Sequence, residues 1–361
     1  MGNSFLSHSD AAMRNRNSIL RFVKEHAPVS RTDIWENMQM SRASVTQVIR
    51  QLQESGLIME TGEEGESTGG RKPRYIVFQG ASRKFYAFDW VSRTLLLMDL
   101  DKKVLYEDEL VFESGVSPGV FSKKIKEAVH RIDSMNLCSR EEISGICLAL
   151  PGQIDSRTGS VICSVELGWQ NVSLCELFVD RFGSNVYLER SSNLMALGEY
   201  SQNRTDKSTH FQLCILSDDG IGVSTIIHGN CQHGSNYMHG ELGHIKVPSD
   251  IVCSCGQKGC LEAVVNKLLE ESAGEFTDEI INYLAIGISS SVNIFDVDSM
   301  LVVGSYPIRM SEDQREMLKE RIYEKVSSQH MRKLSVHYGF HTKELSLLGI
   351  GEYMFEKIFP I

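Results

Sequence analysis

The sequence predicts an α/β protein whose first domain is a winged helix-turn-helix. Three observations support this prediction. The first 82 residues contain three short helical patterns and a polar hairpin, the remainder alternates apolar strand-like runs with amphipathic helical stretches, and a cysteine-rich loop lies in the second half. At 361 residues, 42% of them hydrophobic, the chain can bury a large core and divide into two or three domains.

Helical spacing marks three helices at the start of the chain. The first has an apolar face made of Ile19, Leu20, Phe22 and Val23. The run "PVS" ends it before a second short helix over residues 31–38, and a third helix begins at the N-cap Ser41 and stops near Gly56. The buried face of the third helix is expected to hold Val45, Val48, Ile49 and Leu52. This order of short helices predicts a helix-turn-helix.

The opposite face of the third helix carries side chains suited to DNA. It holds Arg42, Ser44, Thr46, Gln47 and Arg50. Small polar and cationic side chains of this kind reach base edges and phosphates in a major groove. We expect a dimer to read a palindromic operator, because half-sites one or two helical turns apart present one face of the duplex to both copies. The alternative is an ordinary three-helix bundle with a solvated face.

The stretch "LIMETGEEGESTGGRKPRYIVF" predicts a winged hairpin, two β-type runs joined by a polar, glycine-rich loop. Its cationic end brings Arg71, Lys72 and Arg74 within reach of phosphate or of the minor groove. The acidic tip, residues 63–66, is expected to point away from DNA because like charges repel.

Charge is distributed unevenly along the chain. Residues 1–84 hold 12 Lys and Arg against 9 Asp and Glu, a net charge of +3. Subtraction from the totals of 37 and 47 leaves 25 against 38, a net charge of −13, for the remaining residues. A basic head on an acidic body indicates that only the head meets a polyanion.

The apolar runs are too short for a membrane protein. None approaches the roughly 20 residues that cross a bilayer, and the start "MGNSFLSHSDAAMRNRN" lacks the apolar core of a signal peptide. We therefore expect a cytoplasmic protein with no membrane partner. Its nine cysteines are expected to remain thiols in that reducing compartment.

The body of the chain alternates strand and helix patterns. "FYAFDWVSRTLLLMDLDKKVLYEDEL" predicts two or three strands, and "SPGVFSKKIKEAVHRIDSM" predicts a helix. "ISGICLALPG" predicts a further strand and "HFQLCILSDDGIGVSTIIHGN" a hairpin. This alternation is typical of an α/β fold, and each half of the body starts with a hairpin pattern.

Nearly the whole chain resembles the ROK proteins, which are bacterial sugar kinases and sugar-responsive repressors. The resemblance rests on "GICLALPGQIDSRTG", "LGWQNVSLCELF", "SNLMALGE", "DDGIGVSTIIHGN", "HGELGH" and "CSCGQKGCLE". It implies an actin-like (ribonuclease H-like), two-lobed sugar kinase fold. We expect the winged helix-turn-helix over 1–82, an N-terminal lobe over 83–200, and a C-terminal lobe over 201–361 whose last helix returns to the N-terminal lobe. The head resembles the repressor branch, and we expect a homodimer or a dimer of dimers.

The resemblance also assigns the cysteine-rich loop. In the family, the His of an E-x-G-H motif and three following Cys hold a structural Zn²⁺, a role that carries over to His244, Cys253, Cys255 and Cys260. The chemistry agrees, because three thiolates and an imidazole fill a tetrahedral zinc shell and leave no open position for a water. The alternative is three buried thiols beside an unrelated histidine.

An effector site is implied near this loop. By resemblance Glu241 and Glu262 hold sugar hydroxyls, with His244 close by and Gly152 and Gln153 at the rim. Carboxylates suit this task because each accepts strong, charge-assisted hydrogen bonds from adjacent hydroxyls.

Arg190 stands where the family has a sugar-binding Asn. Two interpretations are open. It forms a structural ion pair with Glu189 or Glu241, or it grips an anionic effector such as a sugar phosphate. The expected effector is therefore a sugar or a sugar phosphate.

Residues that a sugar kinase of this family needs are replaced. In "DWVSRT", Val91 and Ser92 occupy the positions of glycines that let backbone N–H groups approach the ATP phosphates. In "DDGIG", Asp218 and Asp219 would place negative charge against a triphosphate. Ser191 stands at the catalytic aspartate, and serine cannot act as that base at neutral pH. We therefore expect no kinase activity and no ATP as a cofactor.

The sequence thus predicts a transcriptional regulator that responds to a sugar or a sugar derivative and acts as a repressor. Its kinase domain is expected to be non-catalytic. Two alternatives remain open. One is an active ROK sugar kinase, which ATP turnover with a sugar panel would detect. The other is an effector-binding protein without specific DNA recognition, which would lack salt-dependent operator binding.

Overall fold

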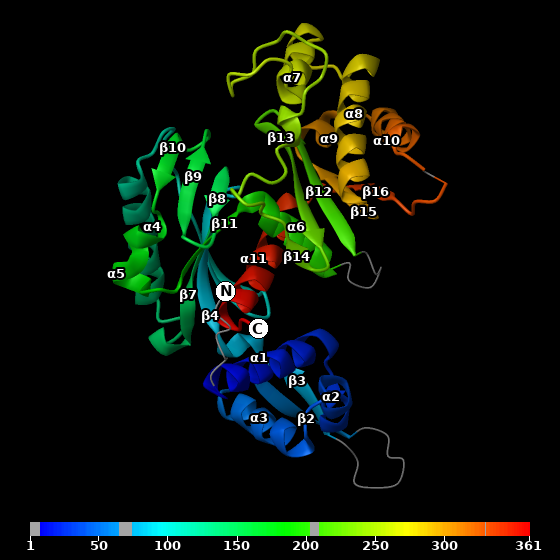
Figure 1. Ribbon diagram of the computed structural model, residues 1–361. Helices are drawn as coiled ribbons and strands as arrows, with labels where there is room; N and C mark the ends of the chain where they lie inside the picture. Colours follow the sequence, from blue (N-terminus) through cyan, green and yellow to red (C-terminus); the bar gives the residue numbers. More distant parts are fainter. Residues whose placement is uncertain (1–7, 65–73, 203–208, 329) are drawn as a thin grey trace.

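The computed structural model describes residues 8–64, 74–202, 209–328 and 330–361. They form a small head and two lobes, each lobe built on a five-stranded sheet, with α6 (Ser191–Gln202) and α11 (Thr342–Ile358) between the lobes (Figure 1). The predicted α/β fold with an N-terminal winged helix-turn-helix is confirmed. Among the described residues, no helix combines the length and apolar character needed to cross a membrane.

The head contains three helices and a sheet in the order β1-β3-β2. Its elements are α1 (His8–His26), β1 (Val29–Ser30), α2 (Arg31–Met38), α3 (Arg42–Glu54), β2 (Ile58–Glu64) and β3 (Arg74–Phe78). The predicted bounds of α2 and the predicted start of α3 are confirmed. Ser30 caps α2 by accepting the N–H of Asp33, and Ser41 caps α3 by accepting the N–H of Ser44. The four apolar residues predicted for the inner face of α3 are buried.

The sheet of the N-terminal lobe has the order β11-β7-β4-β5-β6. Its strands are β4 (Lys84–Asp89), β5 (Thr94–Asp99), β6 (Val104–Glu109), β7 (Ile143–Leu150) and β11 (Val186–Arg190). The first three are antiparallel, and β7 and β11 are parallel to β4. The lobe is completed by α4 (Pro118–Ser134), α5 (Val179–Phe182) and a small sheet of β8 (Gln153–Asp155), β9 (Ser160–Ser164) and β10 (Trp169–Val172).

The C-terminal lobe repeats this arrangement in the order β14-β13-β12-β15-β16. Its strands are β12 (His210–Ser217), β13 (Gly220–Ile227), β14 (Asn230–Cys231), β15 (Ser299–Val303) and β16 (Ser335–Tyr338). Its helices are α7 (Leu261–Glu271), α8 (Asp278–Phe295), α9 (Ser305–Arg309) and α10 (Glu312–Lys325). In each lobe, an antiparallel hairpin supplies the first strand and two later strands join parallel to it through helical crossovers. Both lobes therefore have one topology, as an actin-like fold requires.

The helices α6 and α11 touch backbone to backbone between the lobes. A β-carbon on Gly198 of α6 would overlap the carbonyl of Leu345 in α11. A β-carbon on Gly349 of α11 would likewise overlap the carbonyl of Leu194 in α6. Because α6 also contacts strands of both sheets, this helix pair connects the two lobes.

The far end of α11 anchors the head (Figure 1). Its buried Glu352 lies 2.5 Å from Lys24 of α1 and 2.5 Å from Lys102 in the turn between β5 and β6. Burial opposes the ionisation of Glu352, but the two ammonium groups outweigh it and hold the pKa of this carboxyl below its usual value. Nearby, Glu356 pairs with Arg21. Apolar residues of the head, β4, β5 and α11 form one core, so the head is fixed to the body.

Replacing Gly349 by Ala should lower the free energy of unfolding by about 3 kcal/mol, because the new methyl group meets a backbone carbonyl that cannot rotate away. Urea unfolding followed by circular dichroism measures the change. Gly119→Ala in α4 is the matched control, because its β-carbon has nothing within 4 Å, and that variant should keep or slightly raise the stability. Equal unfolding midpoints for the two variants would show that α6 and α11 do not require this contact.

Candidate functional site

The face of α3 that was predicted to meet DNA lies on the surface of the head. Arg42, Thr46, Gln47 and Arg50 are exposed and Ser44 is half-buried. The hydroxyl of Thr46 donates to the carbonyl of Arg42 at 2.8 Å, so it is engaged within the helix. Arg50 lies 3.7 Å from Glu54, an exposed pair that leaves its charge available because such pairs are weak. The side chains with reach and free polar atoms are therefore Arg42, Gln47 and Arg50.

The wing is described only in part. Arg74 is exposed and lies 3.6 Å from Glu60 of β2. The predicted contacts Arg71 and Lys72 lie outside the described residues, as do the side chains of the acidic tip, residues 63–66.

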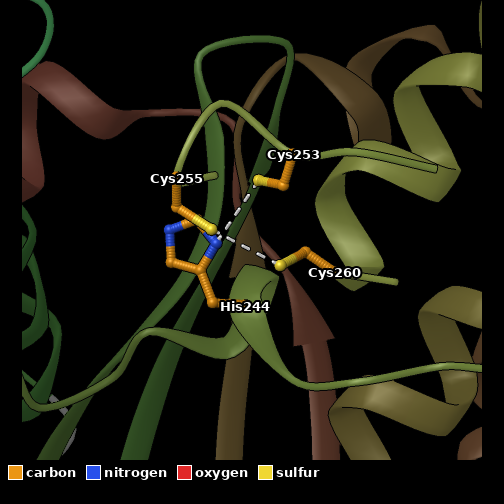
Figure 2. A group of neighbouring side chains, drawn as sticks. All are labelled: His244, Cys253, Cys255 and Cys260. Carbon is orange, nitrogen blue, oxygen red and sulfur yellow. Dashed lines mark hydrogen bonds between the residues drawn. The ribbon is translucent and has the colours of Figure 1, made fainter. Parts of the chain in front are cut away.

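Four predicted metal ligands converge in the C-terminal lobe. Figure 2 shows the side chains of His244, Cys253, Cys255 and Cys260 pointing toward one another. Their ligand atoms all lie within 4.8 Å of one another, with 3.8 Å between Cys253 Sγ and His244 Nδ1 and 3.6 Å between Cys255 Sγ and Cys260 Sγ. Bonds of about 2.3 Å to a tetrahedral centre place ligand atoms about 3.8 Å apart, so the cluster can hold one metal ion.

Two glycines shape the loop that brings these ligands together. Gly256 and Gly259 have φ values of +83° and +70°, which favour glycine. The loop closes by antiparallel bridges, Lys246 with Cys260 and Val252 with Lys258. Lys246 also donates to Cys260 Sγ at 3.0 Å, which suits a thiolate at that position.

Arg190 spans the cleft between the lobes. It ends β11 in the N-terminal lobe, and its Nε donates to the carbonyl of Gly152 at 2.8 Å. Across the cleft its Nη1 donates to the carbonyl of His239 at 3.0 Å and its Nη2 to Glu241 Oε1 at 2.8 Å. Of the two ion-pair partners expected from the sequence, its side chain contacts Glu241. The guanidinium thus hydrogen-bonds both lobes.

Glu189, which sequence reasoning considered only as a partner of Arg190, organises the floor of the cleft. Its buried carboxylate accepts the side-chain N–H of Asn193 and the backbone N–H of Arg190, both at 2.9 Å, and lies 2.9 Å from His233 Nε2. The hydrogen bond to Glu189 raises the pKa of His233, against the opposing effect of burial. Burial, followed by the charge of Arg190, lowers the pKa of the neighbouring His239.

The cleft retains almost no free space. Its cavity has a volume of about 10 Å³. It is lined by Ile154, Arg190, Asn193, Gln232, His233, Tyr237 and His239. That volume holds about one water, far below the roughly 300 Å³ of a small ligand pocket. The protein's own side chains therefore occupy the cleft in this structure.

The predicted effector residues are only partly brought together. Gly152 and Glu241 contact Arg190, and His244 Nε2 lies 3.9 Å from Glu241 Oε2. Glu262, near the start of α7, instead accepts the backbone N–H of Ile221 at 2.9 Å and does not line the cavity. Gln153 begins β8 and is half-buried, also outside the cavity lining.

The two turns predicted from the sequence to correspond to phosphate loops are closed by their own side chains. Buried Asp89 accepts the backbone N–H and the hydroxyl of Ser92 at 3.0 and 2.7 Å, and the hydroxyl of Ser346 at 2.9 Å. In the second turn, Asp218 pairs with Arg309 at 2.9 Å and accepts the hydroxyl of Ser305 at 2.9 Å. Both carboxylates are thus already satisfied within the protein.

Ser191 starts α6 beside Arg190. It is buried, and its hydroxyl has no hydrogen-bond partner among the described residues. In the part of the chain that the structure describes, no basic group is therefore paired with this hydroxyl.

Sequence reasoning missed the histidines, Asn193 and Tyr237 at this site. His233 and Tyr237 lie on the loop after β14 and have no motif of their own, and only their position before "HGELGH" hints at a role. Burial, together with the nearby carboxylate of Asp155 in β8, raises the pKa of Tyr237, so this tyrosine also faces the N-terminal lobe.

Two family models match this chain. The model described as "ROK family" matches residues 92–268, and the model described as "MarR family" matches residues 14–62. The N-acetylglucosamine repressor of Escherichia coli O157:H7 is 30% identical over 78% of this chain and 68% of its own length. A putative xylose repressor of Caldicellulosiruptor sp. (strain Rt8B.4) is 27% identical, with 90% of each chain covered.

Solved structures show the same fold. A ROK family transcriptional regulator, described as a homologue of the E. coli MLC protein, matches with a TM-score of 0.79 and 19% identity, covering 97% of this chain and 98% of that chain. A ROK hexokinase from Thermus thermophilus matches with a TM-score of 0.60 and 20% identity, covering 76% of this chain and 99% of that one. At these sequence identities, the structural similarity shows only that the fold is shared.

The His233–Glu189 pair should make stability depend on pH. Folding raises the pKa of His233, so protonation of this residue stabilises the folded protein. This stabilisation is fully present below the pKa of about 6.5 that histidine has in the unfolded chain, and it is lost as the pH rises through the folded pKa. We expect the melting temperature of the parent to fall more steeply above about pH 6.5 than that of His233→Gln. His130→Gln, at an exposed position outside the cleft, should keep the slope of the parent. Superimposable pH profiles for the parent and His233→Gln would contradict this pair.

Proposed function

This chain belongs to the ROK family, and from that premise we propose that it is a sugar-responsive, DNA-binding transcriptional repressor. The observation that carries the proposal is an exposed helix-turn-helix face on a head that is fixed to a two-lobed body with a polar cleft. Relatives named as N-acetylglucosamine and xylose repressors support a sugar as the effector. Operator DNA is then the macromolecular partner, and the cytoplasm is the expected place of action.

For the DNA contact, we propose that α3 enters the major groove. Arg42, Gln47 and Arg50 are exposed and have the reach for base edges or phosphates, with Ser44 and Thr46 on the same face. The wing would add Arg71, Lys72 and Arg74. A homodimer or a dimer of dimers would present two such helices to a palindromic operator.

The kinase-like body is proposed to bind its ligand without phosphorylating it. Ser92 closes the first phosphate turn over Asp89, and Arg309 closes the second over Asp218. Ser191 offers a hydroxyl where the family's catalytic base is a carboxylate. A repressor benefits from this, because an effector that is not consumed continues to report its own concentration.

The effector is proposed to enter by displacing Arg190. The guanidinium now satisfies Glu241 and two carbonyls, so a ligand must provide hydroxyls for Glu241 and an acceptor for the freed Arg190. A sugar supplies the hydroxyls, and a sugar phosphate would in addition supply an anion to Arg190. Gly152 and Gln153 would lie at the rim, His244 beside Glu241, and Glu262 would hold the backbone next to the site.

The signal is proposed to travel along α6 and α11. Arg190 directly precedes α6, so breaking its bonds to the C-terminal lobe frees the start of that helix. The glycine contact transfers the movement to α11, whose Glu352 is bonded to Lys24 of the head. A coupling of about 1–3 kcal/mol would change operator affinity roughly fivefold to 150-fold.

The His/Cys cluster is proposed to hold a structural Zn²⁺. Three sulfur atoms and one imidazole nitrogen fit the ligand preferences of zinc, and the distances between these ligand atoms fit a tetrahedral site. When bound, the ion supplies a cross-link and no open coordination position. Because His244 follows Glu241 by three residues, ordering this histidine also positions the carboxylate that faces Arg190.

The proposal is tested by measuring DNA binding and effector response separately. Duplexes selected from a random pool by the purified protein serve as operators, and neutral and phosphorylated sugars serve as candidate effectors. Replacing Arg42, Gln47 and Arg50 together by Ala should weaken operator binding at least about a hundredfold, because each base or phosphate contact contributes about 1–3 kcal/mol. Glu241→Ala should respond weakly to the sugar that releases the parent, because it lacks the carboxylate proposed to hold the sugar hydroxyls. It should retain operator binding, because Arg190 still donates to the carbonyls of Gly152 and His239 and so continues to join the two lobes.

Glu113→Ala, at an exposed position of the N-terminal lobe, is the control and should resemble the parent in both assays. Unchanged DNA footprints for the triple variant would show that α3 does not contact the operator. ATP-dependent phosphorylation of a sugar by the parent, lost on substitution in the cleft, would overturn the proposal in favour of a kinase.

The metal proposal predicts one zinc per chain. Cys255→Ser should lose the metal, melt at a lower temperature and respond weakly to the effector, because binding of the ion helps to order the loop. Cys138→Ser, at a half-buried cysteine outside the cluster, should keep the metal. Elemental analysis and thermal unfolding provide the two measurements. Absence of zinc from gently purified parent protein would refute this assignment.

A further inference from the structure

A groove of about 180 Å³ lies between α2 and α3 on the head, separate from the cleft and from the metal cluster. It is lined by Arg31, Thr32, Trp35, Arg42, Val45 and Thr46. Because about 10–15 Å³ of such volume holds one water, the groove has room for a phosphate group and part of its hydration. Its lining combines two arginines, two hydroxyls and an aromatic ring, a composition suited to an anionic backbone.

The two arginines of the groove differ in what they are free to bind. Arg31 is committed to Glu60, with 2.8 Å from its Nη2 to Glu60 Oε1. Arg42 has no carboxylate within ion-pair distance among the residues that the structure describes. The available positive charge of the groove is therefore that of Arg42.

Trp35 holds this charge in place. The guanidinium carbon of Arg42 lies 4.3 Å from the centroid of the Trp35 ring, a cation–π contact between α3 and α2. A guanidinium held against an aromatic face can still donate its N–H groups to an acceptor. The contact also draws Arg42 toward α2, whereas Gln47 and Arg50 have no such contact with α2.

We propose that the groove seats one phosphate of the DNA backbone, and that Trp35 is the positioning residue that aims Arg42 at it. This inference rests on the proposed DNA binding and deepens it. Arg42 then sets the register of the head on the duplex without reading sequence, and base readout falls to Gln47 and Arg50. The exposed hydroxyl of Thr32, which makes no hydrogen bond to the other described residues, is the second donor to this phosphate.

The salt dependence of binding distinguishes this role from mere packing. In the full-length protein, Arg42→Ala should reduce the slope of log K against log salt concentration by about 0.9, the effect of one phosphate contact, and weaken all DNA sequences alike. Trp35→Leu keeps an apolar side chain but removes the ring, and it should reproduce much of that loss. Trp35→Phe should restore binding toward the parent. The double variant Trp35→Leu with Arg42→Ala should be no weaker than Arg42→Ala alone, because the two residues act as one unit.

Gln47→Ala is the matched control on the same helix and should change sequence preference while keeping the salt slope. The proposal is overturned if Trp35→Leu binds with the slope and affinity of the parent, or if the double variant loses the sum of the two single losses. If the folded parent binds no DNA at all, the proposed function fails together with this inference. If the parent and Trp35→Leu bind DNA equally well, the proposed function stands and only the role of Trp35 is contradicted.

Fluorescence of the parent protein provides a measurement that no variant can disturb by misfolding. Of its three tryptophans, Trp90 and Trp169 are 6% and 4% exposed, so an ionic quencher acts chiefly on Trp35. Operator DNA should reduce quenching by iodide. Equal quenching with and without saturating operator would contradict a phosphate seated against this ring.

Discussion

Between the lobes, α6 and α11 cross with their backbones in contact, which is possible only because Gly198 and Gly349 have no side chains. This crossing determines the relation between distant parts of the molecule. α6 starts at the end of β11 beside Arg190, and α11 ends against the head through Glu352. A close-packed pair without intervening side chains has little capacity to absorb displacement. The geometry of the cleft and the position of the head are therefore linked through a stiff element.

The cleft is closed by charge pairing as much as by packing. Arg190 faces Glu241, and His233 faces Glu189, so both of these carboxylates lie beside a group that carries or can acquire a positive charge. Such pairing is required in a cavity of about 10 Å³, because an unpaired charge removed from water is costly. A ligand that opens the cleft must therefore replace hydrogen bonds that the protein already makes. This requirement favours ligands rich in hydroxyls or carrying an anion.

The His/Cys cluster lies on a loop that needs further stabilisation. The segment from Ile245 to Cys260 contains only isolated bridges, and a loop of this kind cannot bury enough apolar surface to order itself. A cross-link through His244 and three cysteines would fix it at its start, middle and end. Since Glu241 immediately precedes this region and Glu262 immediately follows it, the loop controls where both carboxylates lie. The path of the loop leaves Glu241 facing Arg190 and Glu262 accepting a hydrogen bond from Ile221.

Local sequence determined most of the secondary structure and the composition of the His/Cys cluster. Ser30 and Ser41 cap their helices within three residues, and the cysteines of "CSCGQKGC" are so close in the chain that few conformations keep them apart. Tertiary structure alone decided that Arg190 pairs with Glu241, that Glu262 supports the backbone of β13, and that Trp35 makes a cation–π contact with Arg42. Those contacts join residues on different elements, and their formation depends on how lobes and helices are oriented. Hydrophobic periodicity and capping report what each segment becomes, whereas the partner of a long polar side chain depends on which segments the core brings within a few ångströms.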